Sequence, residues 1–130
     1  MRSLFLFACI LATWLCANAK LQNVTVKGVA ICNKKRLANA KVILIDKDTL
    51  DPNDELAIIH TNKEGEFELF GEEDEIGKIE PYLRVHHNCN AKPGCTRVSE
   101  YQIPNNYIGS TYDMTYVTLD IIVHNEKTNC

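Results

Sequence analysis

The amino-acid sequence predicts an all-β domain, a sandwich of two antiparallel sheets with about seven or eight strands. Apolar and polar residues alternate along several short segments, which is the period of a strand with one buried face. Almost no segment shows the 3.6-residue period of a helix. Turn-forming residues separate the alternating segments at regular intervals, as they do in β-sandwiches.

The N-terminal segment has the composition of a secretory signal peptide. Arg2 provides a positive charge, residues 4–16 are almost entirely apolar, and Ala17-Asn18-Ala19 is a small-x-small cleavage motif. The apolar run is too short to cross a hydrocarbon layer of about 30 Å. No later segment is long and apolar enough to do so. We therefore expect residues 1–19 to be cleaved and residues 20–130 to form one soluble domain that is secreted and acts outside the cell or at cell surfaces.

Four segments in the first half of this domain are expected to be strands. The alternation over 24–32 indicates one buried face, and the continuous apolar run 42–45 is typical of a central strand covered on both faces. Residues 56–60 form a third strand. In 66–69, phenylalanine and leucine alternate with glutamate, which is the pattern of a sheet with one wet face.

Three further strands are expected in the second half, at 79–86, 95–103 and 116–123. Pro81 cannot donate a hydrogen bond to a neighbouring strand, so it favours a strand start or an edge strand. The acidic run 72–75 lies between two glycines, and we expect a solvated loop there.

Several motifs agree in order and spacing with one known family. They are Val26-x-Gly28…Cys32, 61–67 (Thr-Asn-Lys-Glu-Gly-Glu-Phe), 79–89 (Ile-Glu-Pro-Tyr-Leu-Arg-Val-His-His-Asn-Cys), 95–97 (Cys-Thr-Arg) and 103–108 (Ile-Pro-Asn-Asn-Tyr-Ile). Over residues 24–123 the sequence resembles the nematode transthyretin-like family of secreted proteins. The resemblance implies a transthyretin-like (prealbumin-like, immunoglobulin-like) sandwich that is exported. Most members of the family have no assigned chemistry.

Four cysteines remain after removal of the signal peptide, and an even number in an oxidising compartment predicts two disulfides. Cys89 and Cys95 enclose a turn-forming run, so we expect them to pair, with a contribution of about 2.4 kcal/mol. Cys32 and Cys130 then pair by elimination, with a contribution of about 4.7 kcal/mol. Four cysteines allow three pairings, so the second bridge depends on the first.

Two segments raise the question of a bound metal ion. His86, His87, Cys89 and Cys95 are zinc-ligand types, but His86 and His87 face opposite ways in a strand and an oxidising compartment favours disulfides. We expect no metal there.

The acidic segment 46–55 suggests calcium. A helix-loop-helix calcium site would need an oxygen ligand at Leu50 and glycine at Asp51, however. A polar hairpin loop is the better prediction, and a weak extracellular calcium site stays open.

No catalytic residue and no cofactor are expected. The sequence contains neither a Gly-x-Ser-x-Gly motif nor a phosphate-binding glycine loop. The transthyretin fold includes hydrolases of purine breakdown, which end in Tyr-Arg-Gly-Ser. Here the chain ends in Glu-Lys-Thr-Asn-Cys, and the similar segment 107–110 lacks the arginine.

The expected function is therefore that of a secreted, non-enzymatic binding or adaptor protein. The slightly acidic balance of 17 acidic against 14 basic residues argues against a nucleic-acid binder. Binding residues on such scaffolds usually lie in loops, and the candidates are 46–55, 72–75 and 89–95. The first two favour a basic partner, or an anionic surface bridged by calcium.

The partner is expected to be an extracellular protein, a lipid surface or a small ligand. The alternatives are a hydroxyisourate-type hydrolase, which the missing tetrapeptide disfavours, and a carrier of a small lipophilic ligand. Asn23-Val24-Thr25 is a possible N-glycosylation site on Asn23. The sequence does not indicate an oligomeric state.

Overall fold

The computed structural model describes residues 19–47 and 53–130. The predicted signal peptide lies almost wholly outside this part of the chain, so its cleavage stays a prediction. The described residues form nine strands and one short 3-10 helix. The elements are β1 (Ala19–Cys32), β2 (Lys35–Arg36), β3 (Lys41–Asp46), β4 (Asp54–His60), β5 (Glu66–Ile76), β6 (Pro81–His87), β7 (Thr96–Gln102), η1 (Asn105–Tyr107), β8 (Thr111–Thr118) and β9 (Lys127–Asn129).

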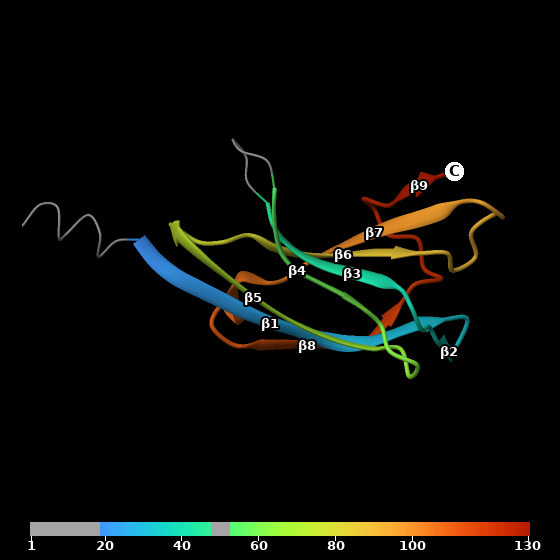
Figure 1. Ribbon diagram of the computed structural model, residues 1–130, viewed down its shortest axis with the longest axis horizontal. Helices are drawn as coiled ribbons and strands as arrows, with labels where there is room; N and C mark the ends of the chain where they lie inside the picture. Colours follow the sequence, from blue (N-terminus) through green and yellow to red (C-terminus); the bar gives the residue numbers. More distant parts are fainter. Residues whose placement is uncertain (1–18, 48–52) are drawn as a thin grey trace, which may run out of the picture.

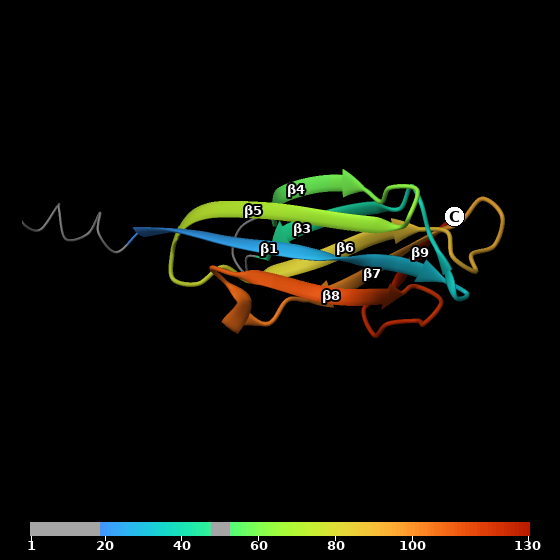
Figure 2. The same ribbon diagram turned by 90° about the horizontal axis from the view of Figure 1, so that it is seen from below.

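The strands form two stacked sheets, which confirms the predicted β-sandwich (Figure 1). The first sheet has the order β2-β1-β5, with β8 also paired to β1. The second has the order β4-β3-β6-β7-β9. Figure 2 shows β5, β1 and β8 side by side in the front layer, with the second sheet behind them. All pairs in the described residues are antiparallel except β1–β8, which is parallel. The connection from β7 to β8, which includes η1, crosses from the second sheet to the first, so β8 can run parallel to β1.

The hydrophobic core lies between the two sheets, as the alternation predicts. Phe67 and Leu69 are buried whereas Glu66 and Glu68 on the same strand are exposed. Strand β3 is buried along almost its whole length because it lies between β4 and β6. In the described residues, no helix has the length and hydrophobicity needed to span a bilayer.

The acidic run 72–75 belongs to β5 and not to a loop, so that prediction was wrong. Strand β1 extends back to Ala19, and its backbone needs a hydrogen-bonding partner, which β5 provides through pairs such as Asn23 with Glu72 and Leu21 with Asp74. The alternation that buries Phe67 and Leu69 therefore continues, and Glu73 points to the same side of the sheet as these residues.

The strand expected at 116–123 was also placed too late. Strand β8 ends at Thr118, and a turn closed by the hydrogen bond from Ile121 N–H to the Thr118 carbonyl follows. Ile121 and Ile122 are exposed. The chain leaves the first sheet here, because the following residues contact β7 of the second sheet. Glu126 binds Arg97, and β9 pairs with β7.

Both predicted disulfide pairings were wrong. Cys32 bonds to Cys89, and Cys95 bonds to Cys130. Cys32 ends β1 in the first sheet, and Cys89 is buried just after β6 in the second, so this bond joins the two sheets. Strand β9 pairs with β7 so that Asn129 lies opposite Thr96, and the next step of the same register places Cys130 opposite Cys95.

Candidate functional site

Three carboxylates from three strands meet at one end of the sandwich. Asp46 ends β3, Asp54 begins β4, and Glu73 lies in β5. One oxygen atom of each lies within 4.8 Å of the others, and we call these residues the carboxylate cluster. Asp46 is buried, Glu73 is half-buried and Asp54 is exposed.

The local structure explains why these three residues converge. Asp46 and Asp54 are direct partners in the antiparallel pair β3–β4. Glu73 lies two positions after Gly71, where a Cβ atom would come within 2.8 Å of Leu56 Cβ, so the two sheets approach closely only because residue 71 is glycine. Glu73 follows on the same side of the strand and therefore points toward the β3–β4 hairpin.

The hydrogen bonding within the carboxylate cluster is incomplete. Asp46 Oδ1 accepts a hydrogen bond from the Glu80 N–H at 2.7 Å. When both groups are deprotonated, the buried oxygens Asp46 Oδ2 and Glu73 Oε2 have no hydrogen-bond partner in the described residues. A proton on Glu73 would let this carboxyl donate to Asp46. That hydrogen bond, together with burial and the neighbouring charge of Asp54, raises the pKa of Glu73 to about 9.

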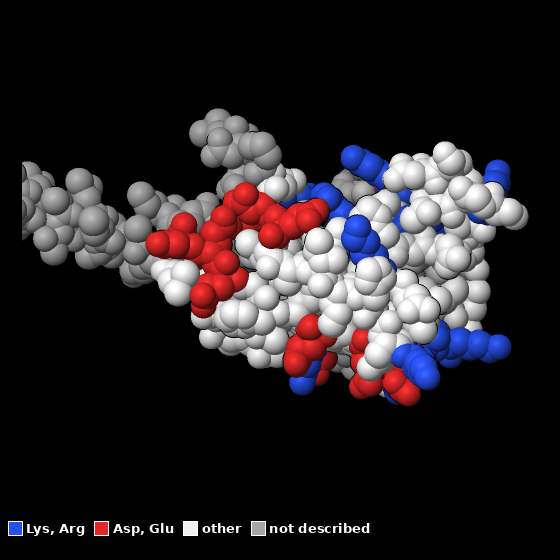
Figure 3. Space-filling model, in the orientation of Figure 1, with Lys and Arg blue, Asp and Glu red and all other residues white. Residues whose placement is uncertain are grey.

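The outer face of the first sheet carries more acidic residues at this end. Glu72 and Asp74 are exposed on β5, next to the exposed side chains of Phe70 and, on β1, Leu21. We call these four residues the end surface. Acidic side chains gather where β5 ends (Figure 3). Sequence reasoning selected both acidic segments as candidates but did not predict that they meet. Residues 48–52 of the first segment lie outside the described residues.

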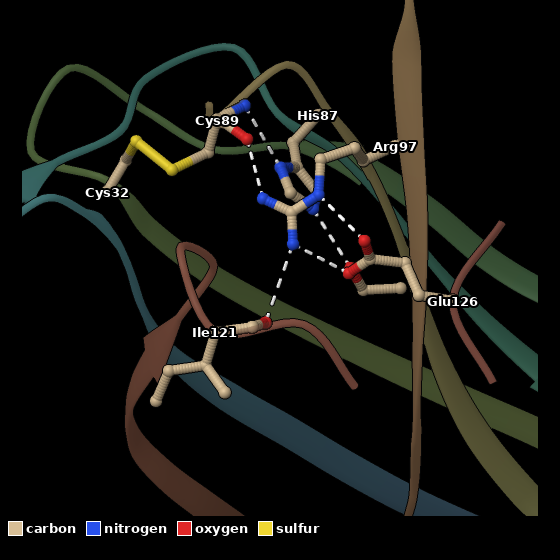
Figure 4. Close-up of polar contacts among 7 residues, drawn as sticks. Cys32, His87, Cys89, Arg97, Ile121 and Glu126 are labelled. Atoms are coloured by element: carbon tan, nitrogen blue, oxygen red, sulfur yellow. Dashed lines mark hydrogen bonds and ion pairs between the residues drawn. A yellow bond between two sulfur atoms is a disulfide. The ribbon is translucent and has the colours of Figure 1, made fainter. Parts of the chain in front are cut away.

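A second polar cluster is buried at the opposite end, around Arg97 of β7 (Figure 4). The Arg97 guanidinium donates to both carboxylate oxygens of Glu126, from Nε at 2.8 Å and from Nη2 at 2.7 Å. Its Nη1 donates to the Cys89 carbonyl at 2.6 Å. Arg97 therefore ties the C-terminal segment to the turn that holds the Cys32–Cys89 bond.

His87 and Ser99 extend this Arg97 network. The Cys89 N–H donates to His87 Nδ1, which assigns the proton of the neutral ring to Nε2, and Nε2 lies 2.9 Å from Ser99 Oγ. Ser99 Oγ in turn donates to Glu126. Burial and the nearby Arg97 lower the pKa of His87 to about 4. Ser99 is fully buried, so its hydroxyl supports the fold and does not meet a substrate.

The buried His87 leads to a prediction for the pH dependence of stability. In the folded protein the ring stays neutral down to about pH 4, whereas in the unfolded chain it takes up a proton below about pH 6.5. The unfolded state therefore binds more protons between these values. The free energy of unfolding should fall as the pH is lowered, by about 2–3 kcal/mol at pH 4.5.

Urea unfolding of the wild type and of His87→Asn, at several values between pH 7 and 4.5, measures this dependence. Asparagine does not titrate, so the variant should lose less stability over the same interval. Glu126 and His86 are neighbouring ionisable groups. Both are present in the wild type and in the variant, so the comparison isolates the titration of His87. Parallel curves for the two proteins would contradict the prediction.

The remaining candidates are placed as follows. Both cysteines of the conceivable zinc set are in disulfides. Tyr107 ends η1, and its ring packs against Tyr112 of β8 with 4.5 Å between centroids. Asn23 lies on β1 opposite Glu72. Its glycosylation stays a prediction.

Sequence reasoning missed the Arg97–Glu126 pair altogether. The two residues are 29 positions apart, and neither belongs to a pattern that indicates burial. The only signal was that Arg97 directly follows Cys95-Thr96 in one of the matching motifs.

Two stacked sheets joined by a disulfide define this chain as a small, cross-linked β-sandwich protein. Residues 27–104 match the family model described as TTR-52, Transthyretin-like family. Transthyretin-like protein 16 of Caenorhabditis elegans is 58% identical over 100% of this chain and 99% of its own length. Transthyretin-like protein 5 of the same nematode is 37% identical over 81% of this chain and 77% of its own length. The chain belongs to the transthyretin-like family, which confirms the resemblance seen in its motifs.

Parts of several solved structures also align with this chain. A 9R-lipoxygenase from Cyanothece aligns with 75% of this chain and 16% of that chain, with a TM-score of 0.46 and 23% identity. A similarity at this level says nothing about the function of the present chain.

Proposed function

We propose that this chain is an exported, non-catalytic binding protein that recognises a protein partner with a basic surface through its end surface. The observation that carries the proposal is the composition of that surface. Two exposed carboxylates, Glu72 and Asp74, lie beside two large exposed apolar side chains, Leu21 and Phe70, which are 62% and 56% exposed. Large apolar groups of this kind are typical anchors of an interface, and the charges select the partner.

The position of these residues on paired strands supports the proposal. Leu21 lies opposite Asp74, and Phe70 precedes Glu72 by two positions on the same face of β5. Their spacing is therefore set by backbone hydrogen bonds and needs no ordering upon binding, which reduces the entropic cost of association. The Cys32–Cys89 and Cys95–Cys130 disulfides are consistent with an oxidising, extracellular compartment.

A double variant, Glu72→Gln with Asp74→Asn, tests the proposal without changing the carboxylate cluster. The wild-type protein is immobilised and used to capture proteins from the extracellular fluid of its own organism. We expect a basic protein that is released as the salt concentration rises, because exposed charges are screened within about 8–10 Å at physiological salt. The double variant should lose this protein.

The matched control is Glu66→Gln with Glu68→Gln, which removes the same charge from the same face of β5 at the other end of the strand. It should retain the partner. A partner that binds equally to the wild type and to the Glu72/Asp74 variant would refute the proposal. A glycan on Asn23 would cover the end surface, so capture is compared before and after enzymatic removal of N-linked glycans.

A further inference from the structure

We propose that the carboxylate cluster of Asp46, Asp54 and Glu73 binds a divalent cation, calcium by its ligand chemistry. The first observation is the burial of Asp46, which is only 1% exposed. Its Oδ1 is held by the Glu80 N–H, while the equally buried Oδ2 has no hydrogen-bond partner. Buried carboxylate oxygens without a partner are rare in proteins because their desolvation is uncompensated, and a bound cation would compensate it.

The second observation is the geometry of the cluster. Calcium binds oxygen ligands at 2.3–2.6 Å, so two oxygens on the same ion lie at most about 5 Å apart. The three ligand oxygens lie within 4.8 Å of one another. Small adjustments of the side chains would therefore let one ion contact all three oxygens while the strands keep their positions.

The ligand type and the exposure select the kind of cation. Three carboxylates form a hard, all-oxygen set, which suits calcium or magnesium and not the nitrogen and sulfur preferences of zinc. Magnesium requires near-ideal octahedral geometry and releases its waters reluctantly, whereas calcium tolerates an irregular set. Asp54 is exposed, so water would complete the coordination shell. An open site of this kind corresponds to the weak extracellular class, with a Kd of about 0.1–1 mM.

The site would act as a link between the two sheets. Asp46 and Asp54 belong to the second sheet, and Glu73 belongs to the first. Strands β1 and β5 run in opposite directions (Figure 1), so the ion would join the sheets near the end of β5, opposite the end of β1 where Cys32 forms its disulfide. This inference is independent of the partner proposed above. The sequence alone had left a weak calcium site open in the segment 46–55, but it did not indicate that Glu73 takes part.

The competing arrangement is a proton shared between Glu73 and Asp46, and the experiment separates the two. The disulfide-bonded protein is freed of metal with a chelator, and calcium chloride is titrated at pH 7.4 with calorimetry and thermal unfolding as readouts. We expect one site with a Kd of about 0.1–1 mM. The unfolding midpoint should rise by about 5–10 °C at 10 mM calcium, and by less with magnesium chloride.

Glu73→Gln is the test variant because glutamine can still donate a hydrogen bond to Asp46 and should fold without calcium. It should weaken calcium binding at least tenfold and lose the rise in midpoint. Glu72→Gln, the exposed neighbour on the same strand, should keep both. The absence of any calcium effect on the wild type would leave the shared proton as the state of the cluster and overturn the inference. An equal effect on the wild type and on Glu73→Gln would place the ion elsewhere and overturn it as well.

Discussion

Replacing Arg97 with methionine is expected to lower the free energy of unfolding by about 3–5 kcal/mol. The side chains of Arg97 and Glu126 are only 6% and 7% exposed, and the guanidinium holds both carboxylate oxygens. The variant would leave the Glu126 carboxylate buried and without its counter-charge, and the Cys89 carbonyl without a donor. Urea unfolding followed by circular dichroism is the suitable measurement, because the single tryptophan, Trp14, lies in the predicted signal peptide.

Arg84→Met is a matched control for this prediction. Arg84 forms an ion pair with Glu100 on the neighbouring strand at 2.6 Å, but its side chain is 28% exposed and Glu100 keeps a second partner in Lys47. Because Arg84 is more exposed than Arg97 and Glu100 keeps Lys47, the control should lose clearly less, about 1 kcal/mol. The double variant Arg97→Met with Glu126→Leu should recover much of the loss, because no charge then remains buried and unpaired. Equal losses for Arg97→Met and Arg84→Met would show that burial of the pair has no special role.

Removal of the disulfide between the sheets should have an effect of similar size. The loop between Cys32 and Cys89 spans a sequence separation of 57 residues, for which the chain-entropy model gives a contribution of about 4 kcal/mol. We expect the variant Cys32→Ala with Cys89→Ala to lose about this amount in urea unfolding under oxidising conditions. Since small domains are stable by only about 5–15 kcal/mol, this is a large fraction of the total.

The second disulfide provides the comparison. Cys95–Cys130 anchors only the three-residue strand β9 to the edge of the second sheet. Its removal should therefore increase hydrogen exchange mainly at the C-terminal end, while the loss of Cys32–Cys89 should increase exchange throughout the core. Peptide mapping without reduction should recover Cys32 linked to Cys89. Peptides that link Cys89 to Cys95 would contradict this prediction from the outset.

The sequence predicted the strands well where a strand has one buried and one wet face. The alternation at Phe67 and Leu69 placed β5 correctly, and the apolar run 42–45 placed β3 in the middle of its sheet. The prediction failed where the composition of a segment indicated a loop but the alternation of its side chains indicated a strand. Glu72 to Glu75 have the composition of a loop, but their position relative to Phe67 continues the strand. The period was the better guide there.

Local patterns by themselves determined the all-β class, the buried face of most strands, the family and the number of cysteines available for disulfides. They act over a few residues, because the direction of a side chain in a strand depends only on its position in the strand. Which cysteines pair, that Arg97 meets Glu126, and that Asp46, Asp54 and Glu73 meet were decided only by the tertiary structure. These contacts depend on the register between distant strands and on the stacking of the two sheets. The register of β9 against β7 brings Cys130 to Cys95, and the close approach of the sheets at Gly71 brings Glu73 to Asp46.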